Sequence, residues 1–109
     1  MIIVIIKMTS LLAKRKELLQ TVQALTQSIR RVKGCMNCSA CQDIENKNSL
    51  LLLEAWETQQ DLDHYLRSDL FTVLLGAKNL MSEPLEITFN TVSFTEGMEA
   101  VKTARGHTP

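Results

Sequence analysis

LLLLEAWETQQDLDHYLRSDLF, residues 50–71, is the stretch of sequence that decides the fold. It opens with four leucines and then contains Glu54 and Trp56, which is the only tryptophan of the chain. Up to Trp56 the apolar residues fit the two-residue period of a strand, and from Thr58 onward they fit the period of a helix. We therefore expect a buried strand that runs directly into a helix.

The residues before this junction predict two further strands and a long helix. Residues 1–8 carry apolar side chains at both odd and even positions, which indicates a strand covered on both faces. Thr9 and Ser10 suit a helix N-cap, and apolar spacings of three and four predict an amphipathic helix of about twenty residues, stopped by Gly34. A second strand over 35–43 is expected to form a hairpin with the leucine-rich strand.

The residues after the junction predict two helical pieces and a last strand. Thr58 with Asp61 resembles a capping box, and Ser68 suits the N-cap of the second piece. Pro84 is expected to end the helical region. Residues 85–94 alternate between apolar and polar, which predicts a half-buried final strand.

The order strand, helix, strand, strand, helix, strand indicates an α+β fold, the ferredoxin-like split β-α-β sandwich. We assign it to residues 1–94 and treat 95–109 as a tail that can form a short helix. In this topology the first and third strands are central, and both are apolar on both sides. Because the helices cover only one face of the sheet, we expect a homodimer with two sheets face to face, a dimeric α+β barrel.

Composition narrows the class of partner. The 109 residues include twelve basic and twelve acidic side chains, and this balance argues against nucleic acid as the main partner. The apolar segment at 2–6 is too short for a membrane span or a signal peptide, so we expect no membrane partner and a cytoplasmic protein. Forty-five per cent of the residues are hydrophobic, which leaves apolar surface for a second subunit.

Cys35, Cys38 and Cys41 form a C-x-x-C-x-x-C pattern that raises the question of a metal site. A fourth cysteine is absent from the sequence. In a regular strand, Cys35 and Cys41 point to one face and Cys38 to the other, so three thiolates cannot converge. We therefore predict reduced cysteines and no metal.

The chain resembles the antibiotic biosynthesis monooxygenase family of dimeric α+β barrels over residues 1–94. The resemblance rests on Gly34-Cys35, the hairpin, Glu54-x-Trp56, the helix that follows, and the last strand after Pro84. It implies a homodimer with a pocket between sheet and helices, and Trp56 on the wall of that pocket. Members include cofactor-free quinol and anthrone monooxygenases, so the implied cofactor is none.

The chain departs from the family pattern at several positions. Many members carry a histidine nine residues after the tryptophan, where this chain has Tyr65, with His64 one residue earlier. An asparagine four residues before the tryptophan is replaced by Leu52. The haem-degrading branch needs an asparagine in the first strand and a histidine at the position of Leu66, and both are missing. Haem degradation is therefore disfavoured.

Six residues are candidates for the site, as catalytic groups (Glu54, His64, Tyr65) or as substrate contacts (Trp56, Leu52, Phe71). A carboxylate on an apolar strand has either a partner or a raised pKa, and a raised pKa suits a base. Histidine has the free pKa of a base near neutrality, and tyrosine can hydrogen-bond a substrate oxygen. Four of these residues also have a purely structural interpretation. Glu54 could form an ion pair at an interface, and His64 could be a surface residue. Trp56 and Tyr65 could simply fill the core.

Two functions stay open at this point. The first is a cofactor-free monooxygenase acting on a small aromatic quinol- or anthrone-like compound. The second is a non-catalytic dimeric α+β barrel that binds a small apolar ligand. No nucleotide-binding or metalloprotease motif occurs in the sequence.

Overall fold

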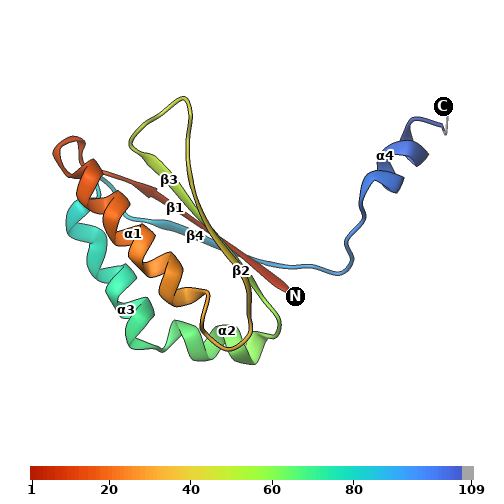
Figure 1. Cartoon of the computed structure of the whole chain (residues 1–109), viewed down its shortest axis with the longest axis horizontal. Helices are drawn as coiled ribbons and strands as arrows, with labels where there is room; N and C mark the ends of the chain where they lie inside the picture. The colour runs from red at the N-terminus through yellow and green to blue at the C-terminus, as the bar shows by residue number, and fades with distance from the viewer. Residues whose placement is uncertain (107–109) are drawn as a thin grey trace.

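The protein, represented by a computed structural model that describes residues 1–106, is one sheet with three helices on a single face and a C-terminal arm that leaves the body (Figure 1). The elements in chain order are β1 (Ile2–Thr9), η1 (Leu12–Lys14), α1 (Arg15–Ile29), β2 (Cys35–Gln42), β3 (Ser49–Trp56), α2 (Gln59–Leu66), α3 (Asp69–Gly76), η2 (Ala77–Leu80), β4 (Glu86–Thr91) and α4 (Met98–Ala104). Here η marks a 3-10 helix.

The strands lie in the order β2-β3-β1-β4, and every neighbouring pair is antiparallel. The predicted ferredoxin-like α+β fold is thereby confirmed, with β1 and β3 at the centre of the sheet. Their register pairs Val4 with Glu54, and Val4 also pairs with Phe89 of β4. Cys38 of β2 pairs with Glu54 from the other side. These four residues therefore form one row across the sheet.

The two faces of the sheet differ in their cover. On the helix side, alternate residues of β1 and β3 are buried against α1, α2 and α3, and they form the core together with Leu18, Val22, Leu25 and Ile29 of α1. On the other side, Ile3, Ile5, Leu51 and Leu53 are only half-buried. We call this second side the open face. Its apolar centre agrees with the sequence pattern, in which β1 and β3 are apolar at both odd and even positions.

The start of the first helix differs from the prediction. Thr9 is the last residue of β1, and Ser10 forms an isolated bridge with Met81 instead of capping a helix. The backbone N–H of Ser10 donates to the carbonyl oxygen of Asn48 at 2.8 Å. Because tertiary hydrogen bonds hold this segment extended, α1 begins only at Arg15 and spans fifteen residues.

The later helix starts agree with the prediction. The Asp61 N–H donates to Thr58 Oγ1 at 3.1 Å, and the Phe71 N–H donates to Ser68 Oγ at 3.3 Å, so both predicted N-caps are confirmed. Gly34 has a φ of 87°, the left-handed conformation that glycine adopts without strain. It lies in the turn before β2 and not directly after α1.

The C-terminal arm, residues 92–106, leaves the sheet where β4 ends. β4 stops at Thr91, which is earlier than the predicted end at 94. The Val92 N–H donates to the Met1 carbonyl oxygen at 3.0 Å, and from there the chain extends away from the body to α4 (Figure 1). Within residues 1–106, no helix is both long and apolar enough to cross a membrane.

Candidate functional site

Glu54 is the centre of a buried polar cluster in the core. The carboxylate lies on the helix side of β3 and is only 1% exposed. The indole Nε1–H of Trp56 donates to its Oε1 at 2.9 Å, and the hydroxyl of Tyr65 donates to its Oε2 at 3.0 Å. Each carboxylate oxygen therefore has a donor of its own. The predicted convergence of Glu54, Trp56 and Tyr65 is present in the structure.

Local sequence explains this convergence. Glu54 and Trp56 are two residues apart on one strand, so their side chains share a face. The cap at Thr58 starts α2 directly after β3, which folds the helix back over that face. Tyr65 then points inward with no exposed surface, whereas His64, one residue earlier, is exposed to solvent. A step of about 100° per residue along a helix separates their directions.

Three aromatic rings pack against one another in this cluster. The rings of Trp56 and Tyr65 stack with centroids 4.6 Å apart and an interplanar angle of 23°. Phe71 of α3 meets the Tyr65 ring edge-on at 5.4 Å. Leu52, the neighbour of Glu54 on the same face of β3, is fully buried. Five of the six candidate residues thus belong to one packed cluster, and His64 does not.

Burial governs the protonation of this cluster. Desolvation raises the pKa of Glu54 above its ordinary value of 4.5, and the hydrogen bonds from Trp56 and Tyr65 oppose this rise. The pKa of Tyr65 is raised, first by burial and then by the neighbouring charge of Glu54. A carboxyl group with a raised pKa is a better base near neutrality than an ordinary one.

Two cysteines also lie beside Glu54, which corrects the prediction that Cys38 faces away from Cys35. A bulge at Met36 shifts the register of β2, so that Cys35 pairs with Trp56 and Cys38 pairs with Glu54 on the same side of the sheet. Only Cys41 faces the other way, opposite Leu51. The sequence gives no signal for this bulge, and sequence reasoning missed both thiols as neighbours of the site.

The pKa values of both thiols are raised. Burial, followed by the charge of Glu54, raises the pKa of Cys38 to about 12 and also raises that of Cys35. All three cysteines are free thiols. Among the residues described here, no group of three or more His, Cys, Asp or Glu side chains could hold a metal ion. The absence of a bound metal stays a prediction for analysis of the purified protein.

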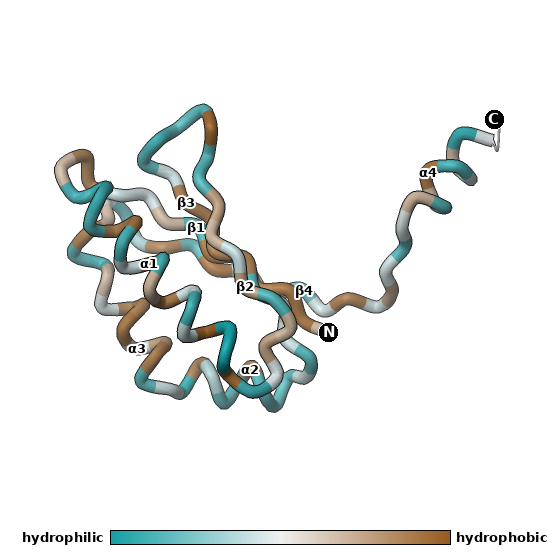
Figure 2. The backbone as a smooth tube through the Cα atoms, in the orientation of Figure 1, coloured by the Kyte–Doolittle hydropathy of each residue, from teal (hydrophilic) through white to brown (hydrophobic). Residues whose placement is uncertain are grey.

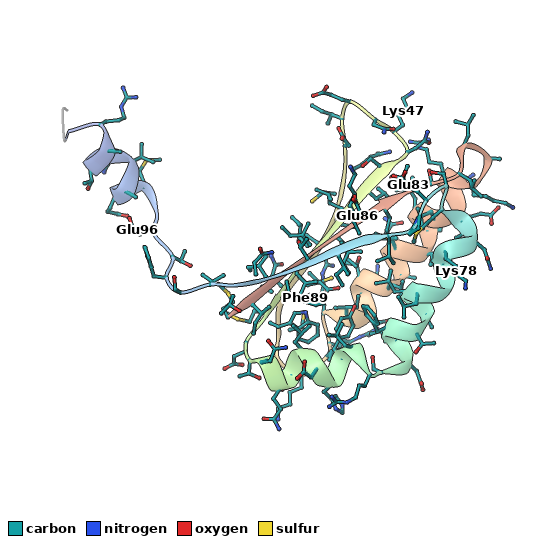
Figure 3. All side chains as sticks on the ribbon, turned by 180° about the vertical axis from the view of Figure 1, so that it is seen from behind. Lys47, Lys78, Glu83, Glu86, Phe89 and Glu96 are labelled. Atoms are coloured by element: carbon teal, nitrogen blue, oxygen red, sulfur yellow. The ribbon has the colours of Figure 1, made fainter. Side chains whose placement is uncertain are left out.

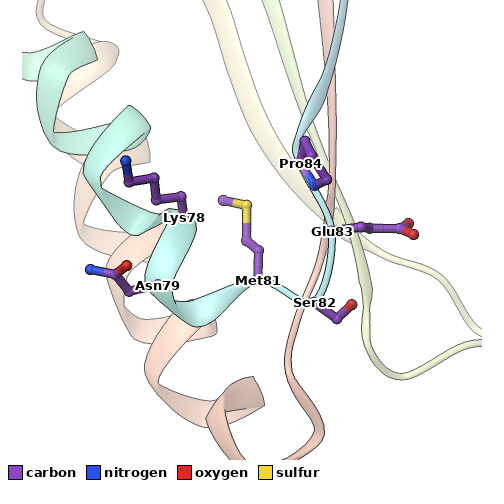
Figure 4. A pocket seen from close by; sticks show the side chains of 6 residues that line it. All are labelled: Lys78, Asn79, Met81, Ser82, Glu83 and Pro84. Atoms are coloured by element: carbon purple, nitrogen blue, oxygen red, sulfur yellow. The ribbon is translucent and has the colours of Figure 1, made fainter.

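Four surface clefts of the described residues are lined by side chains other than Glu54, Trp56 and Tyr65. One lies beside η2, between Lys78 and Pro84 (Figure 4). Another includes His64, together with Lys33 and Arg67. Phe89, seen on β4 from behind in Figure 3, is 49% exposed and shares the helix-side row of Glu54. It marks the rim of the core on the side of β4.

Comparison with known proteins agrees with this architecture. The model of the antibiotic biosynthesis monooxygenase family matches residues 1–74, and a search of curated proteins finds no match. Because the family model matches more than half of the chain, the chain belongs to the antibiotic biosynthesis monooxygenase family.

Solved structures share the fold. A candidate antibiotic biosynthesis monooxygenase from Deinococcus radiodurans superimposes with a TM-score of 0.83 at 18% identity, covering 89% of this chain and 97% of that one. One from Nitrosomonas europaea gives 0.79 at 16% identity, covering 86% and 100%. A conserved protein from Methanosarcina mazei gives 0.76 at 26% identity, covering 81% and 88%.

Proposed function

We propose that this protein is a cofactor-independent monooxygenase, with Glu54 as the base, acting on a small aromatic quinol- or anthrone-like compound. The observation that supports this most is the buried carboxylate of Glu54, whose pKa burial raises and which accepts hydrogen bonds from an indole and a phenol. The phenol of Tyr65 already makes the contact that a phenolic substrate hydroxyl would make. The family match supports the same class of reaction.

The chemistry asks little of the protein beyond this cluster. Glu54 removes a proton from the substrate, and the carbanion so formed is electron-rich enough to react with dioxygen. In an anthrone-like substrate the attacked carbon is a methylene group, so one oxygen atom becomes the ketone oxygen and the other leaves as water with the two methylene hydrogens. In a quinol-like substrate one oxygen atom becomes a hydroxyl group on the ring, and the other leaves as water with the two phenolic hydrogens, so that the product is a hydroxyquinone. Once Tyr65 has rotated away from Glu54, the Trp56 ring offers a stacking surface for the substrate, and the released Tyr65 hydroxyl can donate a hydrogen bond to the negative charge. Leu52 and Phe71 supply apolar contacts.

One observation supports the second candidate function, a non-catalytic barrel that binds a small apolar ligand. Both oxygens of Glu54 are occupied by donors from its own chain, and all three side chains of the cluster are buried. A carboxylate paired in this way can serve packing alone. A substrate reaches Glu54 only if Tyr65 rotates away, so the two functions differ in whether that movement occurs.

Oxygen uptake combined with tryptophan fluorescence separates the two functions. A panel of quinols and anthrones is added to wild-type protein, and Trp56, as the only tryptophan, reports binding by quenching. The monooxygenase proposal expects both quenching and oxygen uptake. It expects Glu54→Gln to lose uptake at least a hundredfold while quenching persists. Glu57→Gln, an exposed carboxylate just beyond the same strand, is the matched control and should keep full uptake.

Quenching without uptake in the wild type would support the binding function and reject catalysis on these compounds. Equal uptake by wild type and Glu54→Gln would reject Glu54 as the base.

A homodimer belongs to this proposal. The open face carries Ile3, Ile5, Leu51 and Leu53 at the centre of the sheet, and no helix of the described chain covers it. A second copy packed face to face would bury these side chains and close the dimeric α+β barrel. The neutral net charge and the reducing conditions that free thiols need fit a cytoplasmic protein without nucleic acid or membrane partners.

Sedimentation velocity tests the homodimer. A chain of 12.3 kDa should sediment as a particle of twice that mass at micromolar concentration. Leu53→Glu places a charge in the open face and should shift the protein to monomer, whereas Ile44→Glu in the exposed β2–β3 turn should not. A wild-type protein that sediments as a monomer would contradict the proposal.

A further inference from the structure

A cleft on the solvent side of α2 gathers positively charged side chains. It has a volume of about 280 Å³ and is lined by Lys33, Gln60, Asp61, His64 and Arg67. Lys33 comes from the turn between α1 and β2, and the other four come from α2 and its C-cap. Figure 1 shows this turn beside α2, and Figure 2 shows mostly hydrophilic positions along the helix. We call this site the basic cleft.

Close packing at Gly34 builds the basic cleft. The side chain of Asp61 lies directly over Gly34, so that an added Cβ there would collide with it. The Glu57 N–H donates to the Gly34 carbonyl oxygen at 2.8 Å, which joins the turn to the segment between β3 and α2. These contacts hold Lys33 beside α2, although the two are far apart in the sequence.

The cations of the basic cleft have no ion-pair partner. Within residues 1–106, the one ion pair lies elsewhere, at the start of α1. Asp61 lines the cleft, but its carboxylate forms no ion pair with Lys33 or Arg67. Asp63, the other carboxylate of α2, accepts a hydrogen bond from Gln59 Nε2 at 2.8 Å. Two cations gathered without a paired carboxylate attract an anion from solution.

The donors of the basic cleft suit a phosphate group. The ammonium of Lys33 offers N–H donors as a compact charge, the guanidinium of Arg67 offers a planar fork for two oxygens of one oxyanion, and the amide of Gln60 adds a neutral donor. A carboxylate has two oxygens, which one guanidinium satisfies. A phosphate group has at least three acceptor oxygens in a tetrahedral arrangement and can therefore accept from several directions at once.

The size of the basic cleft limits the ligand to a small one. Pockets for drug-sized ligands begin at about 300 Å³, so a cleft of about 280 Å³ lies just below that range. It has room for one phosphate group but not for a whole nucleotide. The organic part of a larger phosphate ester would extend from the cleft into solvent.

We propose that the basic cleft binds a phosphate group, as inorganic phosphate or as the monoester of a small metabolite, with Lys33 and Arg67 as the charged contacts. Gln60 and His64 donate further hydrogen bonds, and the negative charge of Asp61 limits the affinity. The site is separate from the Glu54 cluster, which does not line this cleft. The inference goes beyond the proposed function and does not depend on it.

The first test is a titration of the full-length protein with inorganic phosphate at constant ionic strength, followed by the NMR shifts of the backbone amides. The amides of Lys33, His64 and Arg67 should shift along one saturable curve, with a dissociation constant of about 1 mM or below. Sodium acetate at the same ionic strength should give no saturable shift. Glycerol 3-phosphate should move the same amides, and tighter binding than inorganic phosphate would identify an ester as the preferred source.

The second test changes the charges of the basic cleft. Lys33→Gln and Arg67→Gln should each weaken phosphate binding at least about fivefold, because each removes a charged hydrogen bond. Asp61→Asn should tighten binding about threefold or more, because it removes the carboxylate of the lining. Arg31→Gln is the matched control: it removes an exposed cation close to Lys33 in the sequence but outside the lining, and should change binding by less than about twofold. Urea unfolding checks that each variant is folded.

Three results would overturn the proposal. The first is the absence of a saturable shift at the amides of the basic cleft with either phosphate compound. The second is an equal loss of affinity in Arg31→Gln and Arg67→Gln, which would reduce binding to an effect of net charge. The third is unchanged or weaker binding in Asp61→Asn, which would place the phosphate group outside the cleft.

Discussion

The hydroxyl of Tyr65 donates to Oε2 of Glu54 at 3.0 Å in the core, although the two residues belong to different elements, α2 and β3. This contact joins the helical layer to the sheet through a buried polar pair. Burial raises the pKa of both groups, so at neutral pH the phenol keeps its proton and can donate it. The contact is at once a structural link and the candidate catalytic geometry.

Glu54 should make stability depend on pH in a defined direction. Its pKa in the folded protein is raised above 4.5, the value expected for the unfolded chain. At a pH between the unfolded and the folded pKa, the folded state therefore binds more protons than the unfolded state. Stability from this group is fully present below about pH 4.5 and is lost as pH rises through the folded pKa. Glu54→Gln should remove this loss. Urea unfolding of both proteins from pH 4 to pH 8 measures it, and parallel pH profiles would contradict the prediction.

Tyr65→Phe should destabilise the fold although it keeps the ring. The change leaves Oε2 of Glu54 without its donor in a buried environment, which costs about 1–3 kcal/mol. The unfolding free energy in urea is the measurement. His64→Gln, at the exposed neighbouring position, serves as control and should stay within about 0.5 kcal/mol of wild type. Equal stability of the two variants would mean that the hydrogen bond contributes nothing.

Gly34→Ala should be clearly unfavourable, and Gly76→Ala should not be. A Cβ at position 34 would collide with the side chain of Asp61, and the φ of 87° adds backbone strain, so we expect a loss of about 1–3 kcal/mol. Gly76 is helical with a φ of −65°, and nothing lies within 4 Å of an added Cβ. Alanine there should stabilise by up to about 1 kcal/mol. Thermal unfolding of both variants compares them directly.

The three cysteines should react with an alkylating reagent in the order of their exposure. Cys41 is exposed and should be modified first, and the half-buried Cys35 should follow slowly because its pKa is raised. Cys38 is buried, with a pKa raised to about 12, and should react only on unfolding. Peptide mass spectrometry after timed iodoacetamide treatment gives the order. Early modification of Cys38 would show that the core near Glu54 opens readily.

The sequence by itself determined the architecture, because periodicity and element order are local properties. Residues 2–6 and 50–53 are apolar at both odd and even positions, and this pattern identified the two central strands because it is typical of strands that are covered on both faces. The N-caps at Thr58 and Ser68 could also be predicted from the sequence, because the side chain of an N-cap accepts a hydrogen bond from a backbone N–H only three residues away. The shared face of Glu54 and Trp56 followed from strand alternation alone.

Only the tertiary structure decided which neighbours those residues meet. The bulge at Met36 turned Cys35 toward Glu54, and a single extra residue in a strand leaves no mark in the hydrophobic pattern. Ser10 had the chemistry of a cap, but hydrogen bonds to residues distant in sequence kept it extended. The choice of Tyr65 over His64 as the inward residue depended on the angle at which α2 meets the sheet. That angle is set by packing across the whole core, because the large Tyr65 ring gains more by burial there than a polar imidazole could.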